Sequence, residues 1–290
     1  MSHADERGVQ MNETVLTALR CPKCGTGMTF DGKSLLCSGS RRHCYDAAAS
    51  GYVNLAPEHR AGGDSREAVR ARSAFLRRGY YRPVADAIAA LADAYAVPAD
   101  GAARVLFCDA GCGEGYYTEQ LAAYGAVCGF DLSRAAVEAG AKAAGRAGID
   151  AFYAVAGLYR LPLVDGSVDF MLNHFAPCAE EEFCRVLRPG GVLVVGAAGP
   201  AHLLGLKRAV YDTPVRNELR ADLPQGMDLL ERRTVRADIR LEGQADIAAL
   251  FAMTPYYYRT SEADRAKLAA LDVLETEIEV ELSVYRRRQT

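Results

Sequence analysis

From residue 104 onward, short apolar runs alternate with stretches that are typical of helices. The apolar runs lie at 104–109, 126–131, 150–155, 168–173 and 191–197. Helices are expected between them, over 133–148 and about 179–187. Strands that are apolar on both faces and alternate with helices form a parallel sheet with helices on each side. The sequence therefore predicts an α/β fold for this part of the chain.

The C-terminal part follows a different pattern. Residues 234–243 and 275–287 alternate between apolar and polar side chains. A period of two is typical of antiparallel strands that have one face in water. We therefore expect two antiparallel strands at the edge of the sheet.

Two helices are predicted upstream of the sheet. Asp64, with Glu67 three residues later, resembles a capping box and indicates the start of a helix. This helix continues to about Arg78 and ends at Gly79. Pro83 then opens a second helix, because proline fits the first helical turn. The apolar face of the second helix consists of Val84, Ile88, Leu91 and Tyr95.

The N-terminal region is marked by cysteines. Cys21 and Cys24 form a CxxC pair, Cys37 follows in the same polar stretch, and His43 and Cys44 are adjacent. Zinc in structural sites takes four thiolate or imidazole ligands in a tetrahedron, and this spacing is typical of a zinc knuckle. The residues therefore favour structural zinc, with His43 or Cys44 as the fourth ligand.

A redox centre and free thiols are the alternatives for these cysteines. A redox CxxC pair normally opens a helix in a thioredoxin-like unit. Gly25, Gly27 and Asp31 follow the pair here and disfavour such a helix. The sequence also shows no open ligand position for a catalytic water.

Charge is unevenly distributed in this 290-residue chain, whose formal net charge is −3. From residue 41 to 82 there are nine arginines against four acidic residues. A basic segment on a mildly acidic protein suggests a surface that binds a polyanion. A solvated arginine-rich helix would have the same composition.

The chain has no run of 18 apolar residues and no apolar signal sequence at its start. Nine cysteines in such a context favour metal binding or free thiols over disulfides. We therefore expect a cytoplasmic protein that does not enter a membrane.

The loop after the first strand of the α/β part reads DAGCGEGYY over residues 109–117. Its glycines, Gly111, Gly113 and Gly115, allow a sharp turn and the close approach of a ligand. A dinucleotide fingerprint would place its third glycine one residue later, and Asp109 would repel a pyrophosphate. The carboxylate of Asp109 suits a ligand with an ammonium group, such as S-adenosylmethionine. Glycines that only tighten a turn are the alternative.

A second acid supports the same cofactor. Asp131 ends the next strand, where a carboxylate can bind ribose hydroxyls. Acids at two consecutive strand ends around a GxGxG loop favour S-adenosylmethionine over NAD or ATP. For His174, a role in the pocket and a role as a packed core histidine fit the sequence equally well. The other loop residues expected near the pocket are Ala156, Gly157 and Leu158 after the third strand, and Asn173 and His174 after the fourth.

These segments resemble the RlmA-type methyltransferases, which methylate N1 of a guanine in 23S ribosomal RNA. The resemblance extends over most of the chain, and the combination of motifs is specific. The matching motifs are CPKC (21–24), HCYD (43–46), GYVNL (51–55), GDSREAVRARSAFLRRGYYRP (63–83), DAGCGEGYYT (109–118), APC (176–178), PGG (189–191), GPAHLLGLK (199–207) and MTP (253–255).

The resemblance implies an α/β fold of the class I S-adenosylmethionine-dependent methyltransferases. This is a Rossmann-like, mostly parallel seven-stranded sheet, here with an N-terminal zinc-binding module. The expected domains are an RNA-facing zinc module (1–58), a helical connector (59–98) and a methyltransferase domain (99–290). The expected cofactors are S-adenosylmethionine and a structural Zn²⁺ ion.

The resemblance also implies site residues, by position. The zinc ligands would be Cys21, Cys24, Cys37 and His43. The family has three residues between its third cysteine and the histidine, whereas this chain has five, so Cys44 remains a competing ligand. A second departure is the segment Asn173–His174–Phe175. From the residues and the resemblance together, the predicted cofactor-binding residues are Tyr81, Asp109, Gly111, Gly113, Glu114, Gly115, Asp131, Leu132, Gly157, Leu158, Asn173 and His202.

The predicted function is methylation of N1 of a guanine in 23S ribosomal RNA, with the zinc module and the basic helix gripping the RNA. The catalytic base is not assigned, and its candidates are Asp64, Asn173 and His174. The alternative functions are a methyltransferase for a small molecule or protein, and a non-catalytic RNA-binding zinc protein with a relic pocket. The candidate assembly is a homodimer.

Overall fold

The computed structural model describes residues 11–56, 58, 63–98, 104–218 and 224–289. The strands are β1 (Met28–Phe30), β2 (Ser34–Cys37), β3 (Cys44–Asp46), β4 (Tyr52–Asn54), β5 (Leu106–Ala110), β6 (Ala126–Asp131), β7 (Ala151–Val155), β8 (Val168–His174), β9 (Leu187–Ala198), β10 (Met227–Glu242) and β11 (Val273–Arg287). The helices are α1 (Glu13–Ala18), α2 (Arg66–Arg77), α3 (Arg82–Tyr95), α4 (Tyr116–Leu121), α5 (Arg134–Ala147), the short 3₁₀ helix η1 (Leu158–Arg160), α6 (Glu180–Val186), α7 (Leu204–Val210), α8 (Gln244–Ala252) and α9 (Glu262–Ala269).

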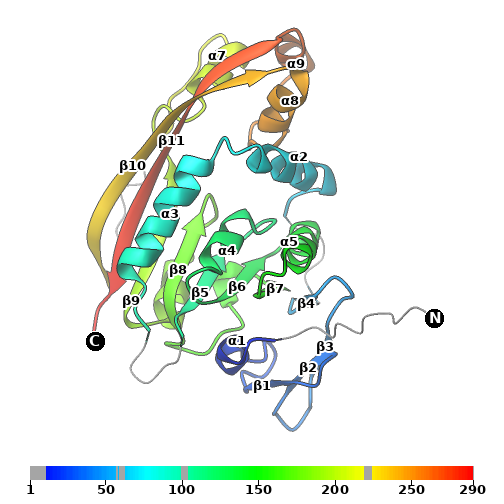
Figure 1. Cartoon of the computed structure of the whole chain (residues 1–290), viewed down its shortest axis with the longest axis vertical. Helices are drawn as coiled ribbons and strands as arrows, with labels where there is room; N and C mark the ends of the chain where they lie inside the picture. Colours follow the sequence, from blue (N-terminus) through cyan, green and yellow to red (C-terminus); the bar gives the residue numbers. More distant parts are fainter. Residues whose placement is uncertain (1–10, 57, 59–62, 99–103, 219–223, 290) are drawn as a thin grey trace, which may run out of the picture.

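The central sheet has eight strands in the order β10–β11–β9–β8–β5–β6–β7–β4 (Figure 1). Pairing is parallel from β4 through β9, as the buried apolar runs predict. β11 pairs antiparallel with both β9 and β10. This order and these directions confirm the class I methyltransferase fold.

The prediction that both C-terminal strands lie at the edge is wrong for β11. Of these two strands, β10 forms the edge, because β11 lies between β10 and β9. The period of two records which faces of a strand are buried, and it carries no information about the neighbours along the hydrogen-bonding direction. Along β11, Ile278, Val280 and Leu282 are buried on the face toward the core.

An eighth strand extends the expected seven. β4, from the GYVNL motif, pairs in parallel with β7, with Tyr52 opposite Tyr153. The predicted domain boundary at residue 58 therefore follows a strand of the central sheet. Beyond this pairing, Val15 and Leu35 of the N-terminal module share one buried core with Phe130 of β6.

The two faces of the sheet are covered differently. On one face, α3, α4, α7 and α8 bury apolar side chains against residues such as Phe107 and Phe170. On the other face, α1 and α6 pack with the N-terminal module. The expected face of α3 is buried at Val84, Ile88 and Leu91, and Tyr95 is half-buried.

Helix α2 begins one residue later than the sequence predicts. Its N-cap is Ser65, whose hydroxyl accepts a hydrogen bond from the backbone N–H of Ala68 at 3.2 Å. Asp64 is not the cap, because its carboxylate is ion-paired with Arg72. Serine and aspartate are comparable caps, so the sequence alone does not distinguish between the two positions.

The hairpin of β10 and β11 continues beyond β9, which pairs only with residues 280–286 of β11. The overhanging part carries α8, which packs against α2. Figure 1 shows α2, α8 and α9 at one end of the molecule and the three-stranded sheet β1–β2–β3 at the other. Within the described residues, no helix has the length and apolar character that crossing a membrane requires.

Candidate cofactor and zinc sites

The glycine loop between β5 and α4 is held by close packing. Gly111 and Gly115 have φ angles of 90° and 83°, in the region that favours glycine. A Cβ atom at Gly115 would lie 2.3 Å from the Tyr153 hydroxyl, and one at Gly111 would lie 2.4 Å from the Cβ of Ala176. Only glycine fits at either position, so the loop sits tightly between β7 and the turn that follows β8.

A pocket opens between this loop, α2 and the turn after β8. It encloses about 830 Å³ of empty space, part of it open to solvent. The predicted cofactor residues that line it are Tyr81, Gly111, Gly113, Glu114 and Asp131.

The pocket is predominantly acidic. Asp64, Glu114 and Asp131 contribute three carboxylates, and Arg72 is the single cation among the described lining residues. S-adenosylmethionine carries a sulfonium, an ammonium and one carboxylate. An acidic site with one guanidinium matches that charge pattern and disfavours a pyrophosphate.

Arg72 is the residue of the basic segment that turns inward. Its Nε donates to Oε2 of Glu114 at 2.5 Å, and its Nη1 donates to Asp64. Burial opposes the charged form of Arg72, but the two carboxylates prevail and raise its pKa above the ordinary value. The guanidinium also lies over the glycine loop, because a Cβ at Gly113 would be 3.2 Å from its Nη2.

Asp131 is fixed at the end of β6 by two backbone donors. Its Oδ2 accepts from the N–H of Gly113 at 3.1 Å, and its Oδ1 accepts from the N–H of Ser133 at 2.7 Å. Burial raises the pKa of Asp131, against the lowering effect of these two donors. The carboxylate reaches the pocket from the strand end at which the sequence predicts a ribose partner.

Asp109 lies beneath the loop rather than in the pocket. Only 2% of it is exposed, and its Oδ2 accepts a hydrogen bond from the Thr118 hydroxyl at 2.6 Å. Burial raises the pKa of Asp109 to about 7. Its direct neighbour is therefore α4, and any effect on a ligand would pass through the loop above it.

The remaining predicted cofactor residues surround the pocket without lining it. Asn173 donates from Nδ2 to the carbonyls of Ala110 and Pro177, at 2.9 and 3.2 Å. His202 lies 3.2 Å from the Tyr81 hydroxyl. The other four lie at the N-cap of α4 (Gly115), beside a neighbouring hollow (Leu132 and Gly157), and next to Gly111 (Leu158).

His174 lines the pocket as a neutral ring. Burial lowers its pKa to about 3, and neither ring nitrogen has a hydrogen-bond partner among the described atoms. Its ring packs edge-on against Tyr117, with centroids 4.5 Å apart. His174 is therefore an aromatic wall of the pocket, and no described hydrogen bond orients it as a proton acceptor.

Four N-terminal side chains converge on one point. The ligand atoms of Cys21, Cys24, Cys37 and His43 all lie within 4.8 Å of one another. Cys24 Sγ is 3.7 Å from Cys37 Sγ, and His43 Nδ1 is 3.4 Å from Cys21 Sγ. Two thiolates on a tetrahedral zinc ion, with Zn–S near 2.3 Å, lie about 3.8 Å apart. The residues present therefore fit zinc.

Cys44 lies outside this cluster. It is exposed, and its Sγ is directed at Asp46 at 3.6 Å. His43 directly precedes β3, and its Nδ1 faces the thiols of Cys21 and Cys37, whereas Cys44 is the first residue of the strand and its thiol is turned away from them. The geometry thus distinguishes between the two candidates, in favour of His43.

This chain is similar to known protein families. Residues 19–61 match a family model described as "RlmA, N-terminal", and residues 108–195 match a model described as "Methyltransferase domain". A 23S rRNA (guanine(748)-N(1))-methyltransferase from Streptomyces fradiae is 31% identical over 271 residues, covering 90% of this chain and 92% of the relative. The chain belongs to the RlmA-type 23S rRNA (guanine-N1)-methyltransferase family.

A second RlmA-type relative, from Micromonospora griseorubida, is 34% identical over 90% of this chain and 94% of its own length. Its name assigns it 23S rRNA (guanine-N(1)-)-methyltransferase activity provisionally. Both relatives match over 90% of this chain.

Several lining residues of this RlmA-type pocket are not predicted by the sequence. Arg72 belongs to the basic segment, and its sequence position gives no sign that it faces inward. Tyr117 directly follows the glycine loop, so its proximity to the loop is the signal that could have indicated it. Phe175 and Met253 are brought to the pocket by the turn after β8 and by the end of α8.

Proposed function

We propose that this RlmA-type protein transfers the methyl group of S-adenosylmethionine to N1 of a guanine in 23S ribosomal RNA. The observation that carries the proposal is the acidic pocket at the glycine loop, on a chain that also carries a Cys₃His cluster. The cofactor supplies an electrophilic methyl group on its sulfonium. The alternatives are a small-molecule or a protein substrate. They are disfavoured because the two relatives that match 90% of this chain are named as methyltransferases of 23S ribosomal RNA.

Within this proposal, the chain's own residues bind the cofactor and orient it. Asp131, fixed by the N–H of Gly113, would accept hydrogen bonds from the ribose, and Arg72, which lies against Gly113, would pair with the carboxylate of the cofactor. Glu114 holds Arg72 in place from the loop. Fixing the cofactor in this way would align its methyl carbon with an incoming nitrogen, which lowers the entropic cost of reaching the transition state.

The N1 proton of guanine must be removed as the nitrogen attacks. Among the three candidates for the base, Asn173 is not basic and His174 has a pKa lowered to about 3. Asp64 is a carboxylate with a 45% exposed side chain on the pocket wall. We therefore assign Asp64 as the proton acceptor, in the manner of a positioned general base.

Zinc is assigned a structural role. Cys21, Cys24, Cys37 and His43 provide four ligands, which complete a tetrahedral site and leave no position for a catalytic water. Holding these ligands together fixes the small sheet β1–β2–β3 against the core.

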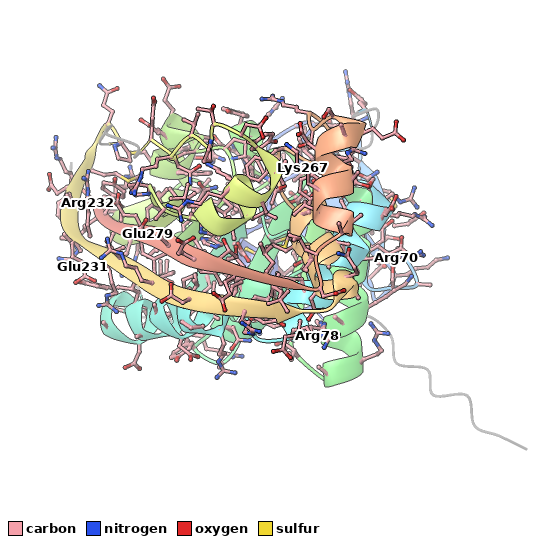
Figure 2. All side chains as sticks on the ribbon, turned by 90° about the horizontal axis from the view of Figure 1, so that it is seen from above. Arg70, Arg78, Glu231, Arg232, Lys267 and Glu279 are labelled. Carbon is pink, nitrogen blue, oxygen red and sulfur yellow. The ribbon has the colours of Figure 1, made fainter. Side chains whose placement is uncertain are left out.

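The RNA backbone is proposed to bind the groove between α2 and α5. Arg66, Arg70 and Arg146 line it, and none of the three makes an ion pair within the described part of the chain. Arg70 projects from the outer side of α2 (Figure 2). Arginines without carboxylate partners are suited to phosphates, which pair with a guanidinium in a bidentate manner.

The test is methylation of unmodified 23S ribosomal RNA by the purified protein, read by reverse transcription. N1 methylation blocks base pairing, so one strong stop at a guanine is expected only when the cofactor is present. Transfer of label to protein or small molecules with none to RNA would overturn the proposal.

The same preparation tests the predicted homodimer by light scattering. The proposed site of action is the cytoplasm, where the ribosomal RNA substrate is found.

A further inference from the structure

Phe175 is an exposed aromatic ring in a strained conformation at the mouth of the pocket. Every residue of β8, directly before it, is buried, whereas Phe175 is 47% exposed. Its φ angle is 53°, which is rare for a bulky residue and costs conformational free energy. A strained, exposed phenylalanine beside a ligand pocket suggests a function that the core does not need.

The surrounding structure holds this conformation. The N–H of Phe175 donates to the carbonyl of Gly196 at 2.9 Å. Asn173 donates to Pro177 beyond the turn and to Ala110 at the end of β5. The amide of Asn173 therefore ties both ends of the turn to the sheet, so that the ring of Phe175 has a fixed place relative to the glycine loop.

The ring rests on other aromatic side chains. Its centroid lies 4.1 Å from that of His174 and 5.3 Å from that of His202. Both histidines are buried, and burial lowers the pKa of each, to about 3 and about 4. Phe175 is thus backed by neutral rings and presents an apolar surface to the pocket.

We propose that Phe175 is the surface on which the acceptor guanine stacks, and that Asn173 positions it through the turn. This inference rests on the proposed function. A base that undergoes chemistry is taken out of its helical stack and is held between aromatic or apolar side chains. Phe175 and Asp131 both line the pocket, and their strands, β8 and β6, are separated by β5, so the ring and the carboxylate assigned to the ribose occupy different places along the pocket.

The cofactor is the competing occupant of this surface. A purine of the cofactor would also stack on an aromatic ring, but the acid assigned to its ribose is Asp131, at the end of β6. Phe175 follows β8, which is separated from β6 by β5 in the sheet. The two occupants differ in one measurable quantity, the affinity for S-adenosylhomocysteine.

The experiment compares Phe175→Leu, Phe175→Ala and Phe175→Tyr with the wild-type enzyme. The matched control is Tyr124→Ala, since Tyr124 is 39% exposed and does not line the pocket. Methyl transfer to unmodified 23S ribosomal RNA gives KM and kcat, and calorimetry gives the affinity for S-adenosylhomocysteine. Stacking on an aromatic side chain is lost on truncation, so Leu and Ala should raise the RNA KM roughly tenfold or more. Tyr should retain the wild-type value, and cofactor affinity should stay within about twofold.

A fourth variant separates substrate binding from structure. Phe175→Gly removes the strain of the positive φ angle. It should therefore melt at or above the temperature of the Ala variant, which keeps the strain, while raising the RNA KM as Ala does. A purely structural role predicts that stability and activity fall together, and that result would overturn the inference.

Two other results would also overturn it. One is a wild-type RNA KM in the Leu and Ala variants, and the other is an equal loss of S-adenosylhomocysteine affinity, which would assign the ring to the cofactor. If the wild-type enzyme itself leaves the RNA unmethylated, the proposed function fails and this inference fails with it.

Discussion

The Nε of Arg72 and the Oε2 of Glu114 are 2.5 Å apart, and this contact joins α2 to the glycine loop. The Glu114 side chain is 6% exposed and that of Arg72 is 21% exposed. Because the two residues belong to different elements, their ion pair fixes one wall of the pocket. It also places Arg72, the single cation among the described residues of that wall, beside the loop.

We expect Arg72→Gln to weaken both cofactor binding and the fold. Breaking a buried ion pair leaves the carboxylate of Glu114 without compensation, at a cost of about 3 kcal/mol. The cofactor carboxylate also loses its partner, so the Kd for S-adenosylhomocysteine should rise roughly tenfold. Arg77→Gln is the control, since Arg77 lies on the same helix and its side chain is 52% exposed. Unchanged cofactor affinity in the Arg72 variant would contradict its role.

Asp64→Asn should reduce kcat by roughly 10²- to 10⁴-fold, because the amide cannot accept the N1 proton. The affinity for S-adenosylhomocysteine should change much less than kcat. Glu67→Gln, an exposed acid on α2, is the matched control and should keep the wild-type kcat. Single-turnover rates measured over a pH series would report the loss. A kcat near the wild-type value would show that the proton leaves by another route.

Asp109 predicts a particular dependence of stability on pH. Its pKa in the folded protein is about 7, against an ordinary value of 3.8. The folded state therefore binds more protons than the unfolded state between these two values, and stability falls as pH rises through this window. Asp109→Asn removes the ionisation while keeping an acceptor for Thr118. The variant should gain on the order of 2–4 kcal/mol relative to wild type at pH 8, and little at pH 4. Equal differences in melting temperature at both pH values would refute the raised pKa.

Zinc removal should destabilise more than the N-terminal module. Val15 and Leu35 share a core with Phe130, so loosening the module exposes apolar surface of the central sheet. A strong chelator should therefore lower the main melting transition by several degrees. Cys37→Ser should lose the bound metal, whereas Cys44→Ser should retain one zinc ion per chain. Retention of zinc by the Cys37 variant, measured by metal analysis, would argue against this ligand set.

The groove between α2 and α5 should control RNA affinity. Arg70→Glu and Arg146→Glu should raise the RNA KM and reduce the slope of log KM against log salt concentration by about one for each phosphate that the variant no longer binds. Cofactor affinity should not change. Arg232→Glu is the control, because Arg232 lies on β10, on the opposite side of the molecule from Arg70 (Figure 2). Equal effects at the groove and at Arg232 would indicate non-specific electrostatics.

The parallel strands are well predicted from the sequence, because a strand buried on both faces is apolar throughout. The run 126–131 coincides with β6 for this reason. The three-residue strand β4 could not be predicted in the same way, since a run that short has no period to detect. Its place in the sheet depends on pairing with β7, which is a tertiary contact.

The sequence predicts those residues of the site whose positions are set by the backbone, at glycine turns and at the ends of strands. The glycines of the loop and Asp131 have fixed places at strand ends, and they lie where the sequence indicates. Arg72 looks like any other arginine of its segment, and only the fold shows that it faces Glu114. The choice between His43 and Cys44 likewise depends on the direction of these two side chains at the start of β3, which spacing alone leaves open.

The pairing of β4 with β7 has a consequence for the order of events during synthesis. The strand of Tyr52 cannot pair until Tyr153, about a hundred residues later in the chain, has been synthesised. At a translation rate of roughly 5–20 residues per second, that wait lasts on the order of 5–20 s. During it the cysteines at 21–37 and His43 have already left the ribosome, so metal capture can precede closure of the sheet. The nascent chain would then bind zinc before the cofactor pocket has formed.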